Sequence, residues 1–152
     1  MRNHKERARR IVGVFVAFMT TATIGVAQDK PASAIATEYA WTGDDGLTQR
    51  FREALERALE ASRDFDVRRA GAREKLRLSI PSNLYGAEIG GRLNFQYVVI
   101  FTNQDSKYLG VSIGSCWAER AEIASCAGTV LHDATEAWKR RTSPQAWPHQ
   151  GR

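Results

Sequence analysis

The chain has 152 residues, which suffices for one domain, and its formal net charge is +5. Residues 1–27 hold five of the 22 Lys and Arg residues and one of the 17 Asp and Glu residues, which leaves 17 basic against 16 acidic side chains in the rest. A nearly neutral remainder gives no support for nucleic-acid binding through bulk charge.

The amino terminus has the pattern of an export signal. Residues 11–27 are apolar or small and carry no charge, and they follow a basic segment that contains Arg2, Lys5, Arg7, Arg9 and Arg10. This pattern predicts a signal peptide over residues 1–27, cleaved after Ala27 or Ala34. An uncleaved membrane anchor is disfavoured because threonines dilute a segment already short for a span of ~20 residues. We expect a periplasmic or secreted protein that meets the membrane only through this segment, during export.

Residues 28–45 are rich in Ala, Thr, Ser, Pro, Gly and Asp, and their apolar residues follow neither a strand nor a helix period. This composition predicts a flexible spacer that ends in a turn at residues 43–46. Tyr39 and Trp41 are unusual in a spacer, which leaves open that they dock on the domain.

A helix is predicted next, because apolar or small residues recur on one stripe while charged residues fall outside it. The stripe consists of Leu47, Phe51, Leu55, Ala58, Leu59 and Ser62. Phe65 and Val67 then have the period of a short strand or an extended exit. One face of this helix must therefore be buried.

Three strands are predicted after this helix. Leu76, Leu78 and Ile80 alternate with polar residues, which is typical of a half-buried strand that ends at Pro81. Residues 81–92 contain three glycines and predict a mobile loop. Residues 93–102 and 108–117 then predict a β-hairpin with a turn of about five residues.

The last predicted element is an amphipathic helix, since the apolar period changes after Trp117. Its stripe consists of Ile123, Ala127, Val130, Leu131, Ala134 and Trp138. Pro144 and Pro148 prevent the helix from continuing, so residues 142–152 predict a disordered tail.

These elements predict a single α+β domain over residues 46–141, in the order α-β-β-β-α. Each helix has one apolar stripe and the strands mostly alternate, so we expect two helices on one face of a small, mainly antiparallel sheet of three to four strands. A core of this modest size benefits from a covalent cross-link.

Cys116 and Cys126 are the only cysteines. In an exported chain this pair predicts a disulfide between the last strand and the last helix, worth about 2–3 kcal/mol in the loop-entropy account. The alternative is a nucleophilic or redox cysteine. The spacing is not that of a Cys-x-x-Cys motif, and His132 is the one histidine of the predicted domain that is available as a base.

Other candidate sites fail a geometric requirement. His132 and Glu136 lie four residues apart, but two ligands without a third do not make a metal site. Ser115, His132 and Asp133 suggest a triad, yet neighbouring helix residues point in different directions and no nucleophile elbow is present. Aromatic residues that include Tyr97 and Trp117 are interpreted as core and cross-strand pairs rather than a binding groove. We therefore predict no catalytic residue, no metal and no cofactor.

Two segments suggest a family. The helix end at residues 53–65, together with Gly114-Ser115-Cys116 and Ser125-Cys126-Ala127, resembles small uncharacterised exported proteins of proteobacteria. The same segments resemble the amino-terminal α/β domain of the periplasmic translocation protein TolB over residues 47–138. The resemblance implies a helix that leads into a short strand and a three-stranded layer closed by a helix, and it implies no catalytic residues.

The functional expectation is an exported periplasmic binding or envelope-assembly module that acts through protein–protein contacts, at a sheet edge or at residues 81–92, without catalysis. Two alternatives stay open. One is an inhibitor or immunity protein against a secreted enzyme, and the other is a small exported enzyme that uses Cys116 or His132.

Overall fold

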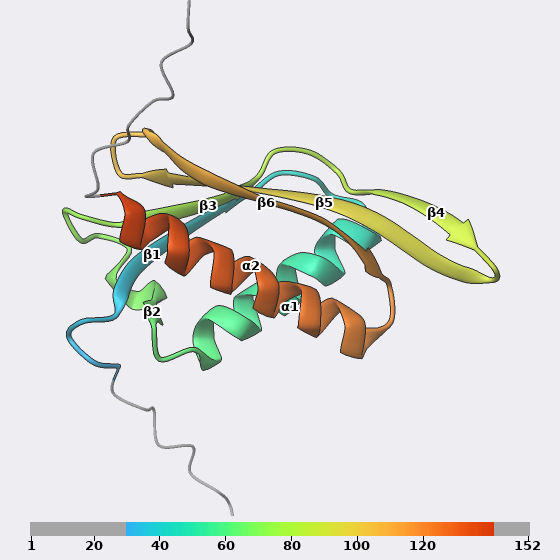
Figure 1. The fold of residues 1–152 in the computed structure, drawn as a ribbon, viewed down its shortest axis with the longest axis horizontal. Helices are drawn as coiled ribbons and strands as arrows, with labels where there is room; N and C mark the ends of the chain where they lie inside the picture. The colour runs from blue at the N-terminus through green and yellow to red at the C-terminus, as the bar shows by residue number, and fades with distance from the viewer. Residues whose placement is uncertain (1–29, 142–152) are drawn as a thin grey trace, which may run out of the picture.

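The computed structural model describes residues 30–141, so the predicted signal peptide over 1–27 and the predicted tail over 142–152 lie outside the described residues. Within residues 30–141 the chain forms two helices, a short 3₁₀ helix (η1) and six strands (Figure 1). Their bounds are β1 (Ile35–Trp41), α1 (Gly46–Ala61), β2 (Phe65–Asp66), η1 (Val67–Arg69), β3 (Leu76–Ile80), β4 (Tyr85–Ile89), β5 (Arg92–Asn103), β6 (Tyr108–Trp117) and α2 (Arg120–Arg140).

The six strands make one mixed sheet in the order β2-β1-β3-β5, with β6 on the far side of β5. β1 pairs in parallel with β2 and β3, whereas all pairings of β5 are antiparallel. β3 and β4 both pair with β5 on the side opposite β6, one after the other along its length. β6 is therefore an edge strand.

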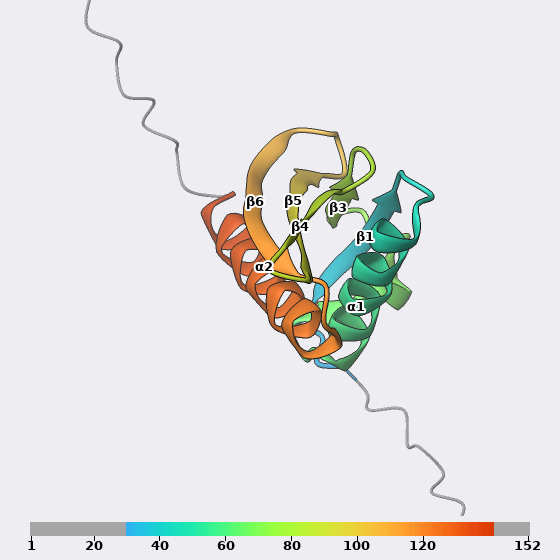
Figure 2. The same ribbon diagram turned by 90° about the vertical axis from the view of Figure 1, so that its right-hand side faces the viewer.

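Both helices cover the same face of the sheet, α2 beneath β6 and α1 toward β1 (Figures 1 and 2). The core lies between the helices and this covered face. It combines alternate residues of the strands with the apolar stripes predicted for the helices, which confirms an α+β fold with two helices. Its largest buried side chains include Phe51, Leu55, Leu78, Phe95, Val99, Phe101 and Val130.

The predicted element order and sheet size are wrong, because the domain begins with β1. Residues 35–41, predicted as spacer, form a strand between β2 and β3. The strand pattern was hidden because two adjacent residues near its start, Ala36 and Thr37, are both buried and neither is a large apolar residue, so no alternation of apolar and polar residues is visible. Tyr39 and Trp41 stack with their ring centroids 5.1 Å apart, and the Trp41 indole N–H donates to Glu56 of α1 over 2.8 Å.

Residues 81–92 contain β4 and a two-glycine turn rather than a mobile loop. The amide of Leu84 donates to the Thr48 hydroxyl over 2.8 Å, and the Asn83 side chain accepts from the Asp44 amide. Gly90 and Gly91 both have positive φ, which lets them form the tight turn between β4 and β5. Glycine here indicates a hairpin turn that projects beyond the helices (Figure 1).

The start of α1 is fixed by Asp45, whose carboxylate accepts from the amides of Leu47 and Thr48. The apolar stripe of α1 packs in the core with residues of the sheet. Among the helices within residues 30–141, none combines the length and hydropathy needed to cross a membrane.

Candidate binding edge formed by β6 and α2

β6 pairs with β5 on one side and with no described strand on the other. The amide of Ala118 donates to the carbonyl of Leu93, so these opposed residues form a hydrogen-bonded pair. Hydrogen-bonded pairs alternate along an antiparallel ladder, so Ser112 and Gly114 also direct their backbone groups at β5. The intervening residues Val111, Ile113 and Ser115, here called the open edge, direct theirs away from the sheet.

The open edge lacks the features that usually protect an edge strand. β6 runs for ten residues with no charged residue and no proline, and its register shift lies at the start, opposite Phe101 and Thr102. Natural sheets normally place lysine, proline or a bulge at such edges, because bare edges pair with other chains. The edge is therefore competent to accept another strand.

An apolar patch adjoins the open edge on the face of the sheet that the helices leave uncovered. The patch consists of Val98 and Ile100 of β5 with Val111 and Ile113 of β6, which are direct cross-strand neighbours. Ile113 is 69% exposed and Val98 and Val111 are each 37% exposed. An added strand would extend this patch with its own apolar side chains.

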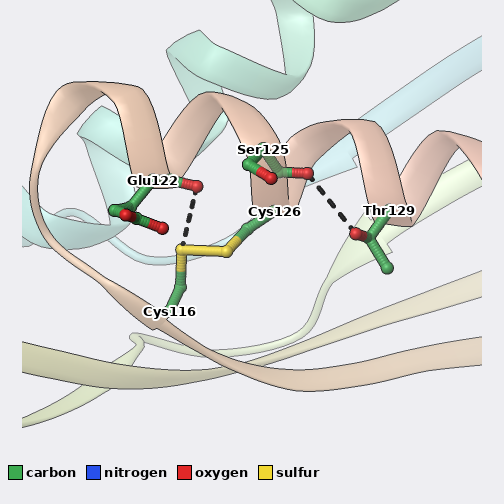
Figure 3. Close-up of a disulfide and its surroundings, with 5 residues drawn as sticks. All are labelled: Cys116, Glu122, Ser125, Cys126 and Thr129. Carbon is green, nitrogen blue, oxygen red and sulfur yellow. Dashed lines mark hydrogen bonds between the residues drawn. A yellow bond between two sulfur atoms is a disulfide. The ribbon is translucent and has the colours of Figure 1, made fainter.

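α2 is fixed to β6 along the covered face. A disulfide joins Cys116 near the end of β6 to Cys126 in α2, with the two Cα atoms 6.3 Å apart (Figure 3). The Cys116 sulfur lies 3.4 Å from the Glu122 carbonyl oxygen. The bond lies inside the layer, because Cys116 is 2% exposed. The predicted disulfide and its two partners are confirmed.

Two further contacts continue this attachment toward the start of β6. The Ser112 hydroxyl donates to the Asp133 carboxylate over 2.6 Å. At Gly110, a Cβ would lie 3.2 Å from the Cβ of Ala137, so α2 approaches the strand closely there. Cross-link, hydrogen bond and close packing hold the edge strand in one conformation, which lowers the entropic cost of binding a partner strand.

On the face of β6 that the helices cover, position 114 requires a residue without a side chain. A Cβ at Gly114 would lie 2.5 Å from the Tyr97 hydroxyl, so this ring occupies the space that a side chain would need. Burial raises the pKa of Tyr97; a hydrogen bond with the Ser112 side chain opposes this rise, and the nearby Asp133 charge adds to it. The raised pKa keeps the phenol neutral beneath the edge.

A shallow groove runs between the edge and α2. It is lined by Phe101, Gly110, Val111, Ile113, Asp133, Glu136, Ala137 and Arg140. The groove thus has a backbone edge on one side and a helix flank with two carboxylates and one guanidinium on the other. This is the geometry of sites that bind an extended peptide by strand addition.

The candidate catalytic residues are not brought together. Cys116 is bonded to Cys126 and presents no thiol. Ser115 is exposed on the uncovered face, whereas Asp133 contacts Ser112 on the covered face, and His132 is exposed on α2. No cluster of three or more metal-ligating side chains occurs within residues 30–141. The triad and metal alternatives therefore gain no geometric support.

The aromatic residues do not gather into a groove. Tyr97 is buried in the core, Tyr85 is 85% exposed on the hairpin, and Arg92 stacks on Trp117 at 4.5 Å. Sequence reasoning missed the pairing of Ser112 with Asp133 and the open edge itself. β6 is visible in the sequence as ten consecutive uncharged residues, but residues 93–104 are uncharged as well, so the absence of charge alone does not identify the edge strand.

Comparison with family models, curated proteins and solved structures finds no match for this chain. The resemblance to the TolB domain stays a prediction.

Proposed function

We propose that this protein is an exported protein-binding module, without catalytic activity, that accepts an extended segment of its partner at the open edge of β6. The observation that carries the proposal is the ten-residue edge strand without a charge, held rigid by α2. Strand addition provides affinity through backbone hydrogen bonds, and the neighbouring patch and groove provide selectivity for side chains. An envelope-assembly role follows if the partner is an envelope protein.

The alternatives differ in what they require of the same molecule. An inhibitor or immunity protein would bind a secreted enzyme through this same edge. Only the identity of the partner therefore distinguishes an inhibitor from the proposed binding module. An enzyme that uses Cys116 requires a free thiol, and one that uses His132 requires a second group beside an exposed helix position. The module is favoured because the edge needs no rearrangement to act.

Export is consistent with an intact disulfide, since such bonds persist in oxidising compartments. Of the two predicted cleavage positions, the one after Ala27 is favoured by contacts of Lys30. Its ammonium donates to the carbonyls of Leu59 and Phe65 over 2.9 and 2.6 Å. Cleavage after Ala34 would remove these bonds.

Crosslinking capture from the periplasm tests the proposal when it is done with an edge variant. Ile113→Lys places a charge on the edge strand, which is a device by which natural sheets discourage strand addition, and the exposed position leaves the fold unchanged. We expect the partner captured by the native protein to be lost with Ile113→Lys.

Ile89→Lys is the matched control. Ile89 is 55% exposed on β4, so the same substitution adds the same charge away from the β6 edge. Capture should be retained with this variant. Equal capture by both variants would contradict a role for the open edge, and a thiol titration that finds two free thiols would favour the enzyme instead.

A further inference from the structure

We infer that the strand that adds to β6 carries a lysine or arginine opposite Ser112, on the side that faces α2. The inference rests on the proposed function and specifies the chemistry of the partner. It follows from the position of Asp133 beside the open edge.

Directly opposed residues of neighbouring strands direct their side chains to the same face of a sheet. A partner residue opposite Ser112 therefore faces α2, where the Ser112 hydroxyl already contacts the Asp133 carboxylate. Residues on either side of it in the partner strand lie opposite Val111 and Ile113 and extend the apolar patch. The partner segment is thus an extended strand with β-branched residues at alternate positions. A basic residue lies at its centre, on the other face.

The charged side chains along the groove determine which charge the partner residue opposite Ser112 should carry. Glu136 is engaged by the Lys139 ammonium at 2.9 Å, and this bond holds its pKa below the ordinary value. Arg140 is exposed one helical turn beyond Glu136, beside the start of β6. Asp133 is partly buried and makes no salt bridge within the described residues 30–141. A partly buried carboxylate that lacks a cation favours a basic partner at that position.

A second copy of this chain fits the edge less well. An antiparallel pairing of β6 with itself that places Val111 opposite Ile113 of the other copy puts the two Ser112 residues opposite each other. The two Asp133 carboxylates would then flank one seam, and like charges across an interface oppose association. A basic residue from a different chain removes this repulsion.

The test uses three capped synthetic peptides, Thr-Val-Thr-Val-X-Val-Thr-Val-Thr, in which X is lysine, glutamine or glutamate. Binding to the purified protein is measured by isothermal titration calorimetry at low salt. We expect the lysine peptide to bind about tenfold more tightly than the glutamate peptide, a difference of about 1.4 kcal/mol, with glutamine between them. The difference should narrow as salt is added.

Asp133→Asn tests the assigned residue while keeping an acceptor for Ser112, and it should reduce the preference for lysine to less than about twofold. Glu60→Gln removes an exposed carboxylate on α1, away from the groove, and should keep the preference.

The outcomes separate this inference from the proposed function. Equal affinity for all three peptides, or a preference for glutamate, overturns the basic partner and leaves strand addition intact. No binding of any peptide overturns both. Dimerisation of the protein in sedimentation, abolished by Ile113→Lys, would show that a second copy occupies the edge and would also overturn the basic partner.

Discussion

The β2 and β6 edges of the sheet are built in opposite ways. At the β2 edge the strand is only two residues long and leads directly into η1. Basic side chains donate hydrogen bonds to backbone carbonyls beside this strand. Lys30 donates to the carbonyl of Phe65, and Arg69 donates to those of Ala32 and Ala34. At the β6 edge the strand is ten residues long and uncharged.

The uncovered face of the sheet also differs between the two edges, from charged near β1 and β3 to apolar near β5 and β6. Near β1 and β3 it carries Glu38, which lies 2.6 Å from the Lys75 ammonium and 3.3 Å from the Arg77 guanidinium. Near β5 and β6 it carries the apolar patch. Protection at one edge shows that this fold accommodates such devices, so their absence at the other edge is a property of β6 rather than of the fold.

The largest expected effect lies in the core that both edges share. Leu55→Ala should lower the free energy of unfolding by about 2–5 kcal/mol, because Leu55 is fully buried and its removal leaves a cavity. Urea denaturation measures the change. Ile113→Ala is the control at the exposed edge and should stay within about 0.5 kcal/mol. Similar losses for both would show that Ile113 is buried.

Loss of the disulfide should affect the two edges unequally. Cys126→Ser should lower stability by about 2–3 kcal/mol without abolishing secretion. Amide exchange should accelerate in β6 and the first turns of α2 more than in β1. Reductant should bring the native protein to the stability of the variant and leave the variant unchanged. Unchanged melting of Cys126→Ser under non-reducing conditions would contradict a stabilising cross-link.

The protected edge should depend on its basic residues. Lys30→Met keeps most of the aliphatic side chain but removes the donor to two carbonyls, so we expect a loss of about 1 kcal/mol. Thermal denaturation measures this loss. Lys107→Met, at an exposed turn between β5 and β6, is the matched control and should have little effect. Equal stability of both variants would show that Lys30 does not protect this edge.

The smallest expected effect is a change in how the stability of the protein depends on pH in the acid range. The hydrogen bond from Lys75 holds the pKa of Glu38 below its ordinary value of 4.5, with Arg77 acting in the same direction and burial opposing both. Its contribution to stability is therefore present above pH 4.5 and is lost as the pH falls through the lower folded pKa. Glu38→Gln should flatten this part of the stability profile in acid titration. Parallel profiles for the two proteins would contradict the assignment.

Sequence patterns predicted the helices and the β5–β6 hairpin well, because Phe51, Leu55, Val130 and Leu131 bury stripes that follow the helix period. They missed β1 because its pairing with β3 is parallel and distant in sequence, and because buried Ala36 and Thr37 do not alternate as apolar residues. Such strands are specified by neighbours rather than by their own pattern.

At the candidate site the cysteine pair was predictable from spacing and context, whereas the contact of Ser112 with Asp133 was not. The two residues are 21 positions apart, and both are common polar residues. Only the way α2 packs on β6 brings Ser112 and Asp133 together. The open edge was present in the sequence as an absence of charge, and its meaning depended on knowing that β6 ends the sheet.

The most direct test of the account is residue-resolved amide hydrogen exchange along β6, without and with the lysine peptide. In the free protein the amides of Val111, Ile113 and Ser115 should exchange quickly, while those of Ser112 and Gly114 should be protected by β5. Addition of the peptide should slow the three fast amides. Five amides that are equally protected in the free protein, or no slowing on saturation with the peptide, would contradict an open edge that binds by strand addition.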